Sequence, residues 1–175
     1  MSKIMICGLN GSGKSTLGRA LAKKTNYVHK DIEDYYFVKE DNYKYDKPKD
    51  RATVSKMVEE DMKKYDNIIF TSCNGDYNGA SSLYDVVIYI DVDKDTRLSR
   101  VKQRSYDLFG ERILEGGDLF LKENIFFDKV YKKDESEIIN WFNNLNCKKF
   151  IIDGLKSTDE NVKIILDYLG EQSNG

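Results

Sequence analysis

A glycine-rich segment at residues 8–15 has the spacing of a phosphate-binding loop. It reads GLNGSGKS and matches the whole pattern G-x-x-x-x-G-K-[ST]. The first N–H groups of a helix lack partners within it and carry partial positive charge, so a flexible turn leading into a helix binds an anion. Lys14 would neutralise the β- and γ-phosphates of a nucleoside triphosphate, and the Ser15 hydroxyl would ligate Mg²⁺. The predicted nucleotide-binding residues are Gly8, Asn10, Gly11, Ser12, Gly13, Lys14, Ser15 and Thr16.

The residues on either side of this segment read as the elements that such a loop requires. Residues 3–7 form a short apolar run typical of a strand, and residues 15–24 have the pattern of an amphipathic helix. A glycine-rich turn that binds nothing is the alternative, but it needs neither element. The chain has no N-K-x-D guanine motif. We therefore predict ATP and Mg²⁺ as ligands.

Three carboxylates, Asp31, Glu33 and Asp34, follow the second predicted strand, and the first lies sixteen residues beyond Ser15. The carboxyl ends of parallel strands open on the same crevice, so these side chains are expected near the γ-phosphate. We predict that Asp31 acts on Mg²⁺ and that Asp34 has a catalytic role toward a substrate hydroxyl. The alternative is a solvated acidic helix start, where carboxylates favour the positive end of the helix dipole.

An arginine-rich helix follows later in the chain, with Arg100 and Arg104 four residues apart and thus on one face. A guanidinium group can chelate phosphoryl oxygens and stabilise the charge that develops during transfer. Paired glycines at 116–117 favour a short mobile lid at about 105–118. We predict catalytic roles for both arginines; ordinary solvent-facing side chains are the alternative.

Strands and helices alternate along the chain, which predicts an α/β fold of three layers: a five-stranded parallel sheet with helices on both faces. We expect one domain over residues 1–175, with an acceptor-side segment at about 31–65 and a polar, substrate-facing loop at 39–50. A serine at 157 and a glutamate at 160 form a capping box. The aromatic residues near 126–127 and Trp141 are expected in core packing. The predicted strands are 3–7, 27–30, 67–72, 85–92 and 149–153; further helices are predicted at 51–64, 94–108, 119–131, 135–146 and 158–170.

Composition excludes several classes of partner. The 28 basic and 30 acidic residues are well mixed and give a net charge of −2, so no basic stripe for nucleic acid is present. No apolar run reaches the ~18 residues of a membrane span, and no targeting segment is evident. Three widely separated cysteines indicate neither zinc nor a disulfide framework. We expect a cytoplasmic protein, a monomer or homodimer, whose partners are ATP and a small molecule.

The order of these motifs resembles the P-loop small-molecule kinases, the adenylate-kinase-like nucleoside and nucleotide kinases, with shikimate kinase as a relative. The resemblance rests on the phosphate loop, D-x-E-D at 31–34, R-L-x-R-V-x-x-R at 97–104 and I-D-G at 152–154. It is closest to a bacterial branch that shares R-x-x-x-x-F-G-x-R-I-x-x-G-G-D at 104–118. It implies strand order 2-3-1-4-5, lid-helix arginines on the transferred phosphate, and a turn at Asp153 and Gly154 near the adenine.

One segment departs from that family. Adenylate kinases follow the third strand with D-G-[FY]-P-R, where this chain has TSCNGD at 71–76. The Walker-B carboxylate and an acceptor-phosphate arginine are absent from this segment, so adenylate kinase activity is not expected. We predict phosphoryl transfer from ATP to a small acceptor, a nucleoside or nucleotide among the candidates. The alternative is a nucleotide-binding switch or slow ATPase without a small-molecule acceptor.

Overall fold

A computed structural model describes residues 2–37, 48–73, 75–77 and 79–171 of the chain. The polar loop predicted at 39–50 lies largely outside the described residues. Within the described ranges, no helix has both the length and the apolarity to span a membrane.

Five parallel strands form a single sheet in the order β2-β3-β1-β4-β5, which confirms the predicted fold class and strand order. The central strand β1 pairs with β3 so that Cys7 lies opposite Ser72, and β2 pairs with β3 so that Asp31 lies opposite Thr71. The carboxyl ends of three strands therefore meet at one edge of the sheet. The strands are β1 (Ser2–Cys7), β2 (Val28–Asp31), β3 (Asn67–Ser72), β4 (Val86–Asp91) and β5 (Lys148–Asp153).

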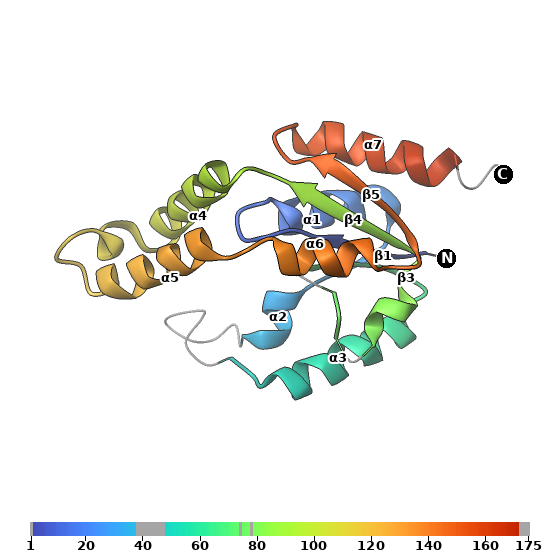
Figure 1. Cartoon of the computed structure of the whole chain (residues 1–175), viewed down its shortest axis with the longest axis horizontal. Helices are drawn as coiled ribbons and strands as arrows, with labels where there is room; N and C mark the ends of the chain where they lie inside the picture. Colours follow the sequence, from blue (N-terminus) through green and yellow to red (C-terminus); the bar gives the residue numbers. More distant parts are fainter. Residues whose placement is uncertain (1, 38–47, 74, 78, 172–175) are drawn as a thin grey trace.

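Helices cover both faces of the sheet (Figure 1). Two of them, α1 (Lys14–Thr25) and α7 (Thr158–Glu171), pack on one face. Three others, α2 (Ile32–Tyr36), α3 (Arg51–Lys64) and α6 (Ser136–Asn143), pack on the opposite face. The predicted capping box is present at the start of α7, where Ser157 and Glu160 each accept a hydrogen bond from the other's backbone N–H.

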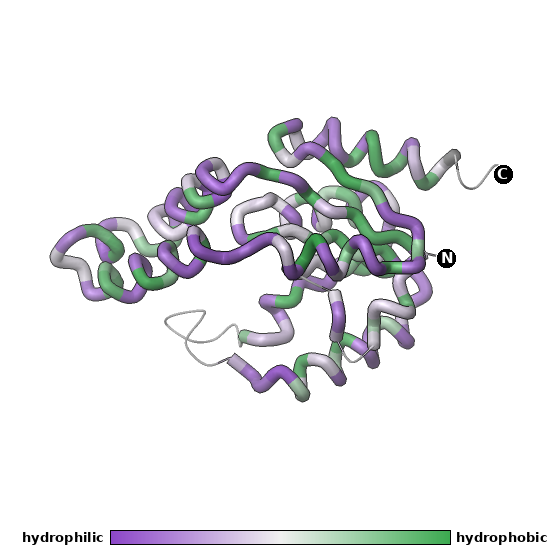
Figure 2. Tube along the Cα trace, in the orientation of Figure 1, coloured by the Kyte–Doolittle hydropathy of each residue, from purple (hydrophilic) through white to green (hydrophobic). Residues whose placement is uncertain are grey.

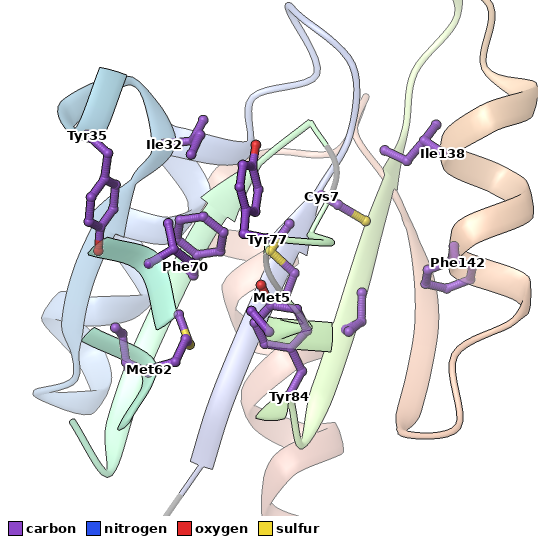
Figure 3. Packing of buried hydrophobic residues seen from close by; sticks show 14 of the residues in the cluster. Met5, Cys7, Ile32, Tyr35, Met62, Phe70, Tyr77, Tyr84, Ile138 and Phe142 are labelled. Carbon is purple, nitrogen blue, oxygen red and sulfur yellow. The ribbon is translucent and has the colours of Figure 1, made fainter. Parts of the chain in front are cut away.

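The two faces of each strand build two separate cores. Met5 and Phe70 point to the side of α3 and α6, whereas their neighbours Ile4 and Ile69 point to the side of α1 and α7. Figure 2 shows how strongly hydrophobic the central strands are, as expected of strands that are covered on both sides. Figure 3 shows Met62 of α3 and Phe142 of α6 directed into the first of these cores.

A helical hairpin projects from the carboxyl end of the sheet (Figure 1). It consists of α4 (Lys94–Phe109), a short 3₁₀ helix η2 (Gly110–Ile113) and α5 (Phe120–Lys132). A third apolar cluster, which includes Val101, Phe127 and Val130, holds α4 against α5. The tip of this hairpin coincides with the predicted lid at 105–118. A second 3₁₀ helix, η1 (Ala80–Leu83), lies between β3 and β4.

Candidate active site

The glycine-rich loop connects β1 to α1 in a conformation that its glycines make accessible. Gly11 and Gly13 have φ angles of 85° and 93°, which side chains with a Cβ rarely adopt. A Cβ on Gly11 would also overlap the backbone of Arg97 at the start of α4. Helix α1 begins at Lys14, so its free N–H groups face the loop. The loop is thus fixed in a turn that leads directly into a helix, as phosphate binding requires.

Two side chains of the loop fit a phosphate ligand. The Ser12 hydroxyl is buried and has no hydrogen-bond partner among the described residues. The ammonium-bearing side chain of Lys14 is mostly buried yet lines a pocket. An unpartnered buried hydroxyl and a buried cation are both costly without a ligand, because each has lost water. The donor set therefore matches an anionic group such as a triphosphate.

Asp31 lies at the end of β2 and is buried, with Thr71 donating a hydrogen bond to its carboxylate at 2.8 Å. Burial by itself would raise the pKa of this carboxyl. Hydrogen bonds from Ser15, from the backbone N–H of Glu33 and from Thr71 outweigh burial and lower the pKa of this carboxyl from its usual value. The charge of Lys14 acts in the same direction. Asp31 is thus held as a carboxylate beside the hydroxyl that was predicted to ligate Mg²⁺.

The described residues contain no cluster of three or more histidine, cysteine or carboxylate side chains that could hold a metal. Mg²⁺ typically uses one or two protein ligands and completes its shell with phosphate oxygens and water. Ser15 and Asp31 fit that mode of binding, in which Mg²⁺ would arrive with the nucleotide. Such an ion would neutralise phosphate charge as it develops.

A pocket of about 460 Å³ opens beside Lys14, and we call it the hairpin pocket. Five parts of the chain build it: the glycine-rich loop, α2 with the residue that follows it, the end of β3, α4 and α5. Its wall contains both apolar and charged side chains. It is lined by Asn10, Lys14, Ile32, Glu33, Phe37, Cys73, Arg104, Lys122, Ile125, Phe126 and Lys129.

A smaller pocket of about 240 Å³, the loop pocket, is lined by another part of the glycine-rich loop. Gly154, which directly follows β5 and ends the I-D-G segment, lines this pocket, whereas Asp153 is not among the lining residues, and Arg100 donates a hydrogen bond to the Gly154 carbonyl at 3.0 Å. Asp153 accepts a hydrogen bond from the Leu155 N–H, which fixes the turn after β5. The pocket is lined by Ser12, Gly13, Thr16, Leu17, Ile90, Arg100, Gly154, Lys156, Thr158 and Asn161.

The structure separates two pairs of residues that the sequence placed together. Arg104 lines the hairpin pocket, whereas Arg100 lines the loop pocket and reaches the Gly11 carbonyl at 3.5 Å. The two arginines thus line different pockets, although both pockets adjoin the glycine-rich loop. Likewise Glu33 lines the hairpin pocket, whereas Asp34 is exposed and is not among the residues lining it.

Helix α5 supplies pocket residues that sequence reasoning missed. Lys122, Ile125, Phe126 and Lys129 have the spacing i, i+3, i+4, i+7, which places them on one helix face. Phe126 was expected in core packing, and it does pack against the hairpin cluster, but it also lines the pocket. Cys73 lines the pocket as well. The helical spacing was a visible signal, but it does not show what the face looks toward.

A third and wider groove of about 610 Å³ lies along α4 and the hairpin tip. It is lined by Leu98, Tyr106, Ile113, Phe120 and other residues of the hairpin. None of residues 8–15 and none of the three carboxylates at 31–34 reaches it. The chemistry-bearing side chains therefore point to the hairpin and loop pockets instead.

The sheet order and the glycine-rich loop at the end of its central strand define a P-loop protein with a kinase-like fold. Residues 4–116 match the AAA domain family, and the chain belongs to this family. The match ends before α5 begins. The residues that α5 gives to the hairpin pocket thus lie outside the matched region.

Known proteins resemble this chain in sequence or in structure. The uncharacterized protein YqaC of Bacillus subtilis (strain 168) is 29% identical over 175 residues, which cover 95% of this chain and 96% of that protein. A deoxyadenosine kinase from M. mycoides with bound dATP has a TM-score of 0.61 at 18% identity and covers 97% of this chain and 100% of its own. A shikimate kinase from Bacteroides thetaiotaomicron has a TM-score of 0.60 at 17% identity, with 97% and 98% covered. The likeness to the two solved structures establishes the fold.

Proposed function

We propose that the protein transfers the γ-phosphoryl group of ATP, bound with Mg²⁺, to a small-molecule acceptor. The observation that carries this proposal is the pair of pockets that share the glycine-rich loop. The loop pocket would hold the nucleoside of ATP, and the hairpin pocket would hold the acceptor. A protein that only binds or hydrolyses ATP has no need of the second pocket. The deoxyadenosine and shikimate kinases named above support the same class of reaction by their fold alone.

The proposed transfer assigns a role to three side chains of the hairpin pocket. An acceptor hydroxyl oxygen forms a bond to the γ-phosphorus while the bond from phosphorus to the β–γ bridging oxygen breaks, which releases ADP. Glu33 takes the hydroxyl proton, because it is the carboxylate that lines this pocket. Lys14 stabilises the negative charge on the transferring group, and Arg104, which lines the acceptor side of the pocket, binds the acceptor.

Replacement of Glu33 by glutamine is expected to reduce kcat about 10²-fold, the scale of a general base, with little change in ATP affinity. Asp34→Asn is the matched control, since it removes the same charge one residue away from an exposed side chain. We expect Asp34→Asn to keep most of the activity. The measurement is steady-state phosphoryl transfer with the best acceptor, alongside ATP dissociation constants. A larger loss in Asp34→Asn than in Glu33→Gln would return the catalytic role to Asp34.

The proposal itself is tested by transfer from γ-labelled ATP to a panel of nucleosides, nucleotides, sugars and hydroxy acids. We expect label on at least one acceptor and an acceptor-dependent rate of ADP formation. Hydrolysis of ATP at a rate that no acceptor changes would instead favour the switch or slow ATPase.

A further inference from the structure

The hairpin pocket is strongly cationic. Four of its lining side chains are positively charged, Lys14, Arg104, Lys122 and Lys129, and one, Glu33, is negatively charged. Lys14 belongs to the glycine-rich loop and is assigned to the phosphates of ATP. The other three cations come from the α4–α5 hairpin. They give the acceptor side of the pocket an excess of positive charge that a neutral acceptor would not balance.

Two of these hairpin cations have no counter-charge within the described residues. Neither Arg104 nor Lys129 takes part in an ion pair or a side-chain hydrogen bond there, whereas Lys132, three residues further along α5, is paired with Asp128 at 2.7 Å. Arg112 at the hairpin tip is likewise paired with Asp118. Arg97, Arg112 and Lys132, which lie away from the pocket, are thus each paired with a carboxylate, while Arg104 and Lys129 line the pocket without such a partner among the described residues.

The face of α5 in the pocket also offers an apolar surface between its two lysines. Lys122 and Lys129 are two helical turns apart, about 10 Å along the helix axis. Phe126 and Ile125 lie between them, and Ile125 is 58% exposed. Ile32 lines the same pocket from α2. A ligand that matches this wall has an apolar or planar body and at least one negative group.

We infer that the acceptor is an organic anion, a hydroxyl compound with a carboxylate or phosphate group that Arg104 and Lys129 bind. This inference rests on the proposed function, because it names the substrate class of the same site. The anionic group would lie against α5, which leaves the hydroxyl toward Glu33 and Lys14. Charge-assisted hydrogen bonds from two cations to one anionic group would hold the acceptor in that orientation.

The test uses equilibrium binding, so that it does not depend on turnover. Two pairs of probes differ mainly in charge: deoxyadenosine with deoxyadenosine 5′-monophosphate, and glucose with gluconate. Binding is measured by calorimetry in the presence of a non-hydrolysable ATP analogue and Mg²⁺. In at least one pair we expect the anion to bind at least tenfold more tightly than its neutral partner, and the pair that responds identifies phosphate or carboxylate. Equal affinity within both pairs, or no detectable binding in either, would overturn the inference.

Variants of α5 then locate the anionic group. Lys129→Gln is expected to lower the affinity for the anion about tenfold and to leave the affinity for the ATP analogue unchanged. Lys129→Arg should keep the affinity for the anion. Lys132→Gln, the matched control on the same helix, should change neither. If Lys129→Gln bound the ATP analogue more weakly but the anion with unchanged affinity, Lys129 would be assigned to the nucleotide and the inference would be overturned. Anion binding that needs Lys129 but leads to no transfer would instead contradict the proposed function alone.

Discussion

Replacement of Lys14 by alanine is expected to lower kcat/KM by 10²-fold or more and to weaken ATP binding. Lys14 is the cation of the phosphate loop, and its side chain is mostly buried at the start of α1, beside the buried carboxylate of Asp31. The positive charge of Lys14 would attract the negative charge of the β- and γ-phosphates at a place where little water screens this interaction. Alanine cannot replace that charge. The transition state therefore loses more stabilisation than the bound substrate does.

Lys24→Ala is the matched control for this variant. Lys24 lies in the last turn of the same helix and is exposed, so alanine there removes the same charge away from the loop. Both variants should fold, because alanine is the best helix former. The measurements are calorimetric ATP dissociation constants and steady-state kinetics, with thermal melting as the check on folding. Unchanged ATP affinity and turnover in Lys14→Ala would refute the phosphate-loop assignment.

Replacement of Asp31 by asparagine is expected to reduce turnover about 10²-fold while the protein still folds. The structure gives Asp31 two roles. It caps α2 by accepting a hydrogen bond from the Glu33 N–H, and its charge lies beside Ser15, where Mg²⁺ is proposed. Asparagine is as good a helix cap as aspartate, so the variant removes the charge and keeps the cap. We therefore expect a raised Mg²⁺ requirement together with the slower turnover.

Asp50→Asn provides the control for the capping role. Asp50 caps α3 by accepting a hydrogen bond from the Thr53 N–H, and it lines none of the three pockets described above. The Asp50→Asn variant should therefore have the same kinetics and the same Mg²⁺ dependence as the wild-type protein. Activity is measured across a Mg²⁺ titration, with melting temperatures for both variants. Full activity in Asp31→Asn at low Mg²⁺ would exclude a metal-linked role for this carboxylate.

The depressed pKa of Asp31 sets the pH range in which its charge acts. Because hydrogen bonds from Ser15 and Thr71 outweigh burial and lower the folded pKa of this carboxyl, the ionised group stabilises the folded protein fully above about pH 5, where the unfolded carboxyl is also ionised. That contribution is lost as the pH falls through the folded pKa. The stability difference between the wild-type protein and Asp31→Asn should therefore be constant from neutral pH to about pH 5 and shrink below it.

The sequence by itself determined the fold class and the phosphate loop. Spacing of the glycines and Lys14 specifies the turn and the helix start, because both depend on local backbone preference. The alternation of strands and helices predicted a parallel sheet covered on both faces, and the register confirms a parallel sheet in the predicted order. The predicted helix at 51–64 coincides with α3. These features depend on contacts that are near in sequence or on a simple rule of hydrophobic pattern.

The direction of individual side chains depended on the tertiary structure. Glu33 and Asp34 are neighbours with the same charge, and only the placement of the short helix α2 decides which one lines the pocket. Arg100 and Arg104 share a helix face, yet the position of the glycine-rich loop against α4 divides them between two pockets. A helical repeat specifies which residues share a face, but what that face meets is set by packing elsewhere.

Helix α5 is the clearest case of what packing alone decided. Phe127 and Val130 face the apolar cluster against α4, Ile125 faces the hairpin pocket, and Phe126 contacts both. From the sequence both faces read as core, because hydrophobic spacing does not distinguish contact with a neighbouring helix from contact with a ligand. The angle of the hairpin on the sheet brings Lys129 to the same pocket as Lys14, 115 residues earlier in the chain. Local sequence does not encode such a meeting, since it arises only when the third apolar cluster and the sheet are both formed.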